Sequence, residues 1–234
     1  MPPIRLSSEA RRETILAAAK ACFARHGFAG TTTKSVAAAA GISEALLFKH
    51  FSSKSALYAE ILDEACEADP ELQRLQALPP SSETLVFLVR EMVRHFLAAV
   101  EHPDEEDTQR MKLLISSHLE DGEFARLLYQ KISDIIAPIF TASLDRAVQS
   151  GDAVSIGAPP MNLFWFAHQM IHMVALTRMP TIPSLTYGDP DSLRRQLCEF
   201  ILRGLGLKER AIQTYLDRAL PVDQATNQLV SESA

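Results

Sequence analysis

Apolar residues recur along most of the chain at the three- and four-residue spacing of α-helices. The two-residue alternation of half-buried strands is almost absent, and no Asn-Gly or Asp-Gly dipeptide joins two strand-like runs. Capping residues, prolines and glycines divide the apolar stripes into separate helices. The pattern therefore predicts an all-α fold, with helices at about residues 8–26, 33–40, 44–50, 54–68, 85–100, 111–115, 122–149, 160–179, 190–203 and 208–220.

Several of these boundaries rest on single residues. Gly27 and Gly41 are expected to end the first two helices, because glycine tolerates the left-handed backbone conformation. Ser43 is expected to cap the third helix. The run LPPSS at residues 78–82 is typical of a linker. Pro138 lies inside the helix predicted at 122–149 and should kink it or split it.

The charge is unevenly distributed. Residues 1–58 contain eight Lys or Arg and three Glu, which gives a net charge of +5. The rest of the chain contains fifteen Lys or Arg and twenty-six Asp or Glu, which gives −11. A basic head on an acidic body is expected when only the head meets a polyanion.

The cysteines and the apolar runs of the chain indicate the cellular location of the protein. Cys22, Cys66 and Cys198 fit neither a zinc-binding spacing nor a disulfide framework, so we expect reduced packing residues. The N-terminal residues lack the apolar stretch of a signal peptide. The most apolar run, 161–174, contains one Asn, one Gln and two His, which favours a buried helix over a membrane span. These features predict a cytoplasmic protein without a membrane partner.

The most informative segment is residues 31–54, TTTKSVAAAAGISEALLFKHFSSK. A helix-turn-helix needs a packed first helix, a tight turn and a second helix that offers small or polar side chains to base edges. Ala37–Ala40 allow close approach of the two helices, and Gly41 suits the turn. The residues expected to pin the second helix to the core are Ile42, Leu46 and Leu47. Those expected to point outward are Glu44, Ala45 and Lys49.

The same segment closely resembles the tetracycline-repressor (TetR) family of bacterial regulators. The resemblance covers about the first sixty residues, and beyond them only the helical architecture matches. It is carried in order by Phe23, Gly27, the threonines before the second helix, Val36-Ala37, Ala40-Gly41-Ile42-Ser43, Leu47-Phe48, His50-Phe51, Lys54 and Leu57.

The resemblance implies a three-helix DNA-binding head, a fourth helix joining it to a larger helical body, a homodimer and a small-molecule effector. We accordingly expect a DNA-binding domain at 1–54, an effector-binding and dimerisation domain at 55–221 and a flexible tail at 222–234. The body is expected to dimerise through the helices at 160–179 and 190–203, packed as a four-helix bundle.

The resemblance also carries over a set of DNA contacts: Thr33, Lys34, Ser43, Glu44, Ala45, Phe48, Lys49, His50 and Lys54. Their chemistry divides them. The residues suited to phosphate oxygens are Thr33, Lys34, His50 and Lys54. The residues suited to base edges are Glu44, Ala45 and Lys49. The family usually has tyrosine in place of Phe48, and phenylalanine cannot donate a hydroxyl hydrogen bond to phosphate. Ser43 can act as a helix cap alone.

A tentative effector pocket is assembled from apolar and aromatic residues of the body: Met92, Phe96, Met111, Ile115, Phe140, Trp165, His168, Met170, His172 and Met173. Ordinary core or dimer packing explains the same residues equally well. His168 and His172 share a helix face, but no carboxylate or cysteine accompanies them there, so no metal is expected.

No catalytic motif is visible: the sequence has no Gly-rich phosphate loop, no GxSxG and no paired acids in a recognisable arrangement. We therefore expect neither an enzyme nor a cofactor. The leading hypothesis is a repressor that binds a palindromic operator as a dimer and is released by a small apolar or amphipathic effector. The alternative is a helical protein-interaction module tethered to DNA, without such an effector.

Overall fold

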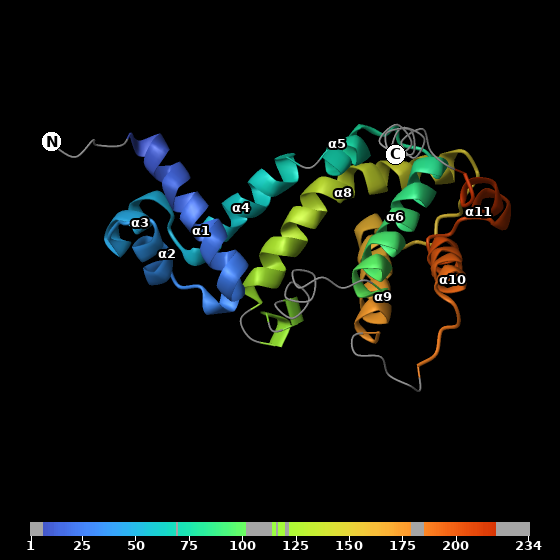
Figure 1. Ribbon diagram of the computed structural model, residues 1–234. Coiled ribbons are helices and arrows are strands. Elements are labelled where there is room, and N and C mark those ends of the chain that lie inside the picture. Colours follow the sequence, from blue (N-terminus) through green and yellow to red (C-terminus); the bar gives the residue numbers. More distant parts are fainter. Residues whose placement is uncertain are drawn as a thin grey trace, which may run out of the picture. The chain divides into compact units, whose positions relative to one another are not determined.

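The computed structural model describes residues 7–68, 70–101, 114–115, 117–119, 122–178 and 185–218. Within these ranges every regular element is a helix, apart from one isolated bridge between Ala153 and Leu207 (Figure 1). The chain forms two compact units: Met1–Pro70 with Asp104–Ser133, and Glu71–Pro103 with Asp134–Ala234. The predicted all-α fold is confirmed.

The first unit holds the N-terminal helices. Helix α1 contacts both α2 and α4, and α2 contacts α3. Helix α8 (Glu123–Gln149) contributes its residues up to Ser133 to this unit. The bounds of the others are α1 (Ser8–Gly30), α2 (Thr33–Ala39), α3 (Glu44–His50) and α4 (Lys54–Ala68).

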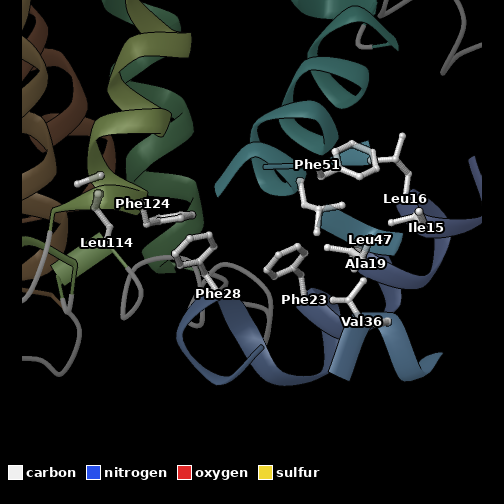
Figure 2. Packing of buried hydrophobic residues seen from close by; sticks show 13 residues of the cluster. Ile15, Leu16, Ala19, Phe23, Phe28, Val36, Leu47, Phe51, Leu114 and Phe124 are labelled. Atoms are coloured by element: carbon white, nitrogen blue, oxygen red, sulfur yellow. The ribbon is translucent and has the colours of Figure 1, made fainter. Parts of the chain in front are cut away.

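The core of the first unit combines aliphatic residues with a group of aromatic rings (Figure 2). The Phe28 ring lies 5.8 Å from that of Phe124 and 5.2 Å from that of Tyr58, measured between centroids. Ile15 and Leu47 are fully buried beside them. Helices as short as α2 and α3 are marginal alone in water, so this shared packing is what stabilises them.

The second unit is organised around α6 (Ser82–Glu101), which packs against three other helices. Most of its residues between Leu85 and Leu97 that carry large apolar side chains are buried, as expected for a central helix. The helices that contact it are α9 (Pro160–Leu176), α10 (Pro190–Gly204) and α11 (Glu209–Tyr215). Within the described residues, no helix is both long and apolar enough to span a membrane.

The structure settles one alternative for the sequence-based helices and adds one helix. Helix α8 continues through Pro138, so the chain is not split there. An additional helix, α5 (Pro70–Ala77), occupies residues that the pattern left between helices. Proline lacks an amide hydrogen, which the first helical position does not need, so Pro70 can begin α5.

Other predictions are only partly covered by the described residues. Leu114 and Ile115 are helical, whereas Met111 and the tail from residue 219 onward lie outside the described ranges. Cys22 and Cys198 are free thiols, and burial raises the pKa of Cys198 to about 12, as suits a packing residue. The domain boundary predicted after residue 54 stays a prediction.

Candidate nucleic-acid interface

The segment from Thr32 to Leu46 forms two capped helices joined by a tight turn. Thr32 and Ser35 cap the start of α2 reciprocally, each backbone N–H donating to the other side chain at 3.1 Å. Gly41 follows α2 with a φ of +66°. The Ser43 hydroxyl oxygen accepts from the Leu46 N–H at 3.2 Å and caps α3. The predicted glycine turn and serine cap are both confirmed.

The turn fixes α3 against the core. The Ile42 N–H donates to the Ala37 carbonyl at 3.0 Å and the Gly41 N–H to the Ala38 carbonyl at 3.2 Å, which together make a Schellman motif. Leu47 is fully buried, and Ile42 packs against the core while partly buried. Helix α3 is therefore held by one face, and its other face remains open.

The open face of α3 carries the side chains expected to meet DNA. Ala45 and Lys49 are exposed, and Phe48 is 48% exposed. Lys34, at the start of α2, is also exposed. Neither lysine forms an ion pair with any residue that the structure describes. The face thus offers a small side chain, an aromatic ring and cationic groups, which suits contact with bases and phosphates.

Two of the proposed DNA contacts bind each other. The Thr33 hydroxyl donates to Oε1 of Glu44 at 2.5 Å, joining the first residue of α2 to the first residue of α3. Both side chains are only partly exposed. Sequence reasoning assigned Thr33 to phosphate and Glu44 to bases separately, and it missed the bond because the residues are eleven positions apart.

Lys54 has a structural contact of its own. Its Nζ donates to the Phe28 carbonyl at 3.0 Å and lies 4.2 Å from the centroid of the Phe28 ring. This contact ties the start of α4 to the last turn of α1, beyond the kink at Gly27. An ammonium group has three N–H donors, so the contact leaves others for a phosphate oxygen.

Arg12 of α1 contacts the C-terminal end of α3, a role that the sequence did not reveal. Its guanidinium donates to the His50 carbonyl at 3.3 Å, lies 4.4 Å from the Phe51 ring centroid and pairs with Glu60 at 2.6 Å. His50, a predicted phosphate contact, is half-buried at the last position of α3. Its place is therefore fixed by α1 as well as by its own helix.

Another unpredicted residue is Thr31. It is buried, and its hydroxyl donates to the carbonyls of Cys22 and Gly27. Gly27 has a φ of +67° and kinks α1, which continues to Gly30 instead of ending at Gly27 as predicted. Thr31 therefore holds the irregular end of α1, whereas Thr32 is the residue that caps α2.

Part of the positive charge counted for residues 1–58 is neutralised by ion pairs within the first unit. Acidic residues of α4 pair with cations of α1: Glu60 with Arg12 and, at 2.5 Å, Glu64 with Lys20. Asp63 pairs with Lys131 of α8. Among the described residues, Lys34 and Lys49 on the α2–α3 face have no acidic partner, so their charge stays available where the helix-turn-helix is open.

In the second unit, the structure brings five of the tentative effector residues together. The Phe96 ring lies 5.1 Å from the His168 ring and 5.5 Å from the His172 ring, measured between centroids. Trp165 lies 5.4 Å from His168 and, with Phe140, contacts the buried Phe164. These residues form an aromatic cluster, defined here as Phe96, Phe140, Phe164, Trp165, His168 and His172.

The remaining tentative residues are placed differently. Met92 and Met170 are partly buried in the second unit, and Met173 is 58% exposed. Ile115 belongs to the first unit, and Met111 lies outside the described residues. Burial, followed by the charge of His172, lowers the pKa of His168 to about 4, so His168 is neutral at neutral pH. Among the described residues, no group of three or more His, Cys, Asp or Glu could hold a metal ion.

Two short helices, a glycine turn and an open second helix define a DNA-binding helix-turn-helix. Residues 15–61 match the sequence model of bacterial regulatory proteins, tetR family. The HTH-type transcriptional repressor Rv1474c of Mycobacterium tuberculosis (strain ATCC 25618 / H37Rv) is 32% identical over 129 residues, which are 55% of this chain and 62% of that protein. The HTH-type transcriptional repressor AcnR of Corynebacterium glutamicum is 27% identical over 140 residues, which are 60% and 67% of the two chains.

The fold is also shared with a solved structure. The complex of SmeT with triclosan has a TM-score of 0.56 and 25% identity over 91% of this chain and 99% of that one. SmeT is the repressor of the Stenotrophomonas maltophilia multidrug efflux pump SmeDEF. Over residues 15–61 the chain is thus similar to the tetR family of bacterial regulatory proteins. Its matches span about two thirds or less of the length of the curated relatives.

Proposed function

We propose that this chain is a transcriptional repressor that binds a palindromic operator as a homodimer and is released by a small molecule. The observation that carries the proposal is the exposed α3 face, held by a capped helix-turn-helix within the segment that matches the family. The curated relatives reported above are themselves named repressors. Two heads on one dimer would enter successive major grooves about one helical turn apart.

The proposed DNA contacts divide into residues that bind phosphate oxygens and residues that read base edges. Lys34, His50 and Lys54 would fix the register of the head on phosphate oxygens. Lys49 would donate to guanine acceptors, and Ala45 would touch a thymine methyl group. The exposure of Lys34, Ala45 and Lys49 supports this division.

A binding experiment tests the proposal. Duplexes selected from a random pool by the purified protein should converge on a palindrome, and their affinity should fall as salt rises. Lys49→Ala should relax the base preference at one position of each half-site, at a cost of about 1–3 kcal/mol for the preferred base. Lys34→Ala should weaken binding to every duplex alike and reduce the salt slope by about one.

Three results would count against the proposal. Failure to select any palindrome would reject operator binding. Equal effects of Lys49→Ala and Lys34→Ala on all sequences would reject the division of roles. An affinity that does not depend on salt would reject phosphate contacts as the source of binding.

The proposed effector is a small apolar or amphipathic molecule that binds beside the aromatic cluster. The cluster supplies apolar surface and polar edges from Trp165 and His172. Because His168 is neutral, the cluster would favour an uncharged ligand over an anion. The related SmeT has been solved with triclosan. The effector must bind the DNA-incompetent state more tightly, and we expect α4 to transmit the change to the head.

A further inference from the structure

The bond between Thr33 and Glu44 constrains the carboxylate of Glu44 beside the open face of α3. Thr33 lies within the Thr32–Ser35 capping box, and Glu44 follows the capping residue Ser43. The backbones of both residues are therefore fixed, and the branched side chain of threonine has few rotamers. The 2.5 Å bond engages Oε1 of Glu44, and Oε2 has no hydrogen-bond partner among the described residues.

The Glu44 carboxylate can contribute favourably to DNA binding only in a narrow range of positions. Near the backbone it would be repelled by phosphates, whose charge has the same sign. In the major groove, guanine presents acceptors, and thymine presents an acceptor and a methyl group. Adenine presents an amino donor beside its N7 acceptor, a pair that suits an amide better than a carboxylate. The amino group of cytosine is a donor that a glutamate accepts from. A glutamate that is free to rotate would reach unfavourable groups as readily as favourable ones.

We propose that Thr33 is a positioning residue that holds the Glu44 carboxylate so that Oε2 accepts a hydrogen bond from a cytosine amino group. Each operator half-site then requires cytosine at one position. This role replaces the phosphate contact expected for Thr33 from the sequence. The inference rests on the proposed DNA-binding function and specifies which base one residue pair reads.

The test compares base preference among four variants of the full chain. Wild-type protein is used to select duplexes, and the four bases are then compared at each half-site position by competition binding. Thr33→Val keeps the shape of the side chain and removes the hydroxyl, whereas Thr33→Ser keeps the hydroxyl. Glu44→Ala removes the carboxylate, and Glu44→Gln replaces it with an amide that prefers adenine.

The expected result is a cytosine preference at one position that depends on both residues. Glu44→Ala should abolish it, and Glu44→Gln should shift it towards adenine. Thr33→Val should reduce the ratio of the affinity for the cytosine duplex to that for the guanine duplex about three- to tenfold. This reduction is smaller than the full discrimination that one base contact typically provides, because Glu44 itself is still present. Thr33→Ser should keep that ratio within about twofold of wild type.

Other outcomes overturn the inference. If Thr33→Val weakens binding to all four duplexes equally, Thr33 contacts phosphate or only supports the fold, because loss of folded protein changes every affinity by one factor. If Glu44→Ala keeps the cytosine preference, Glu44 does not read that base. If wild-type protein selects no sequence at all, the proposed function fails and the inference falls with it.

Discussion

At the scale of single residues, Phe48 presents an aromatic ring on the open face of α3 and is 48% exposed. Related regulators usually carry tyrosine at this position, whose hydroxyl can donate to phosphate. We predict that Phe48→Tyr strengthens binding to all DNA sequences about two- to tenfold, because one added hydrogen bond is worth about 0.5–1.5 kcal/mol net. Fluorescence anisotropy with operator and scrambled duplexes measures this. Phe48→Leu, which adds no hydroxyl, is the control, and an unchanged or weaker Phe48→Tyr would contradict the prediction.

His168 gives the second unit a pH-dependent stability. It is 3% exposed, and burial together with the charge of His172 lowers its pKa from 6.5 to about 4. The unfolded chain therefore binds a proton at His168 more readily than the folded chain does. Stability from this residue is fully present above pH 6.5 and is lost as the pH falls from 6.5 towards 4.

The predicted size of this effect is about 2 kcal/mol between pH 7.5 and pH 5, from the shift of the pKa. His168→Gln keeps a neutral polar side chain and removes the titration. Urea unfolding at both pH values should show that the wild type loses about 2 kcal/mol more than the variant. Equal losses in the two proteins would show that His168 is not held neutral by burial.

At the scale of elements, the turn between α2 and α3 depends on Gly41. Its φ is +66°, and a Cβ added there would meet no atom within 4 Å. Backbone strain alone should therefore set the cost of Gly41→Ala, at about 1 kcal/mol of unfolding free energy. Because the turn sets the angle of α3, affinity for operator DNA should fall as well. Chemical denaturation and anisotropy measure the two effects.

Gly30→Ala is the matched control. Gly30 lies in the last turn of α1 without a positive φ, and an added Cβ would meet only the Cβ of His26 at 3.4 Å. Alanine in a helical conformation is favoured over glycine, so the variant should be as stable as the wild type or slightly more stable. A loss equal to that of Gly41→Ala would show that loss of any glycine destabilises this unit.

The helices with strong end signals were the ones that the sequence predicted best. Helices α3 and α4 begin and end where expected, because Ser43 and Ser53 offer caps that act locally. Asp189 caps α10 by accepting from the Ser192 N–H at 2.9 Å, and the helix begins at residue 190 as predicted. Helix α5 lies between the helices predicted at 54–68 and 85–100, and it begins at Pro70, since proline is accepted at a first helical position.

The candidate site was less accessible to sequence reasoning. Exposure of Ala45 and Lys49 followed from helical periodicity around the buried Leu47. The bonds from Thr33 to Glu44 and from Lys54 to Phe28 join residues eleven and twenty-six positions apart. Such contacts depend on how helices pack, and no local pattern encodes them. Contact roles for individual residues on DNA remain predictions for the same reason.

At the scale of the whole molecule, the second unit leaves large apolar side chains exposed on two neighbouring helices. Phe166 and Met173 are seven residues apart on α9 and therefore share a face, with exposures of 63% and 58%. Phe200 on α10 is 62% exposed, and α9 packs against α10. Exposed apolar groups of this size on adjacent helices are typical of an interface. They support the proposed homodimer through these two helices.

We predict that Phe166→Glu and Phe200→Glu each convert the dimer to a monomer, because a carboxylate buried in an apolar interface is unpaired. Light scattering after size exclusion should give half the wild-type mass. Operator affinity should fall about a hundredfold or more, since the second head no longer binds at the effective concentration that the dimer provides. Val154→Glu replaces another exposed apolar residue, 52% exposed and outside both helices, and should leave mass and affinity unchanged. If both phenylalanine variants remain dimeric, the two chains associate through a different surface.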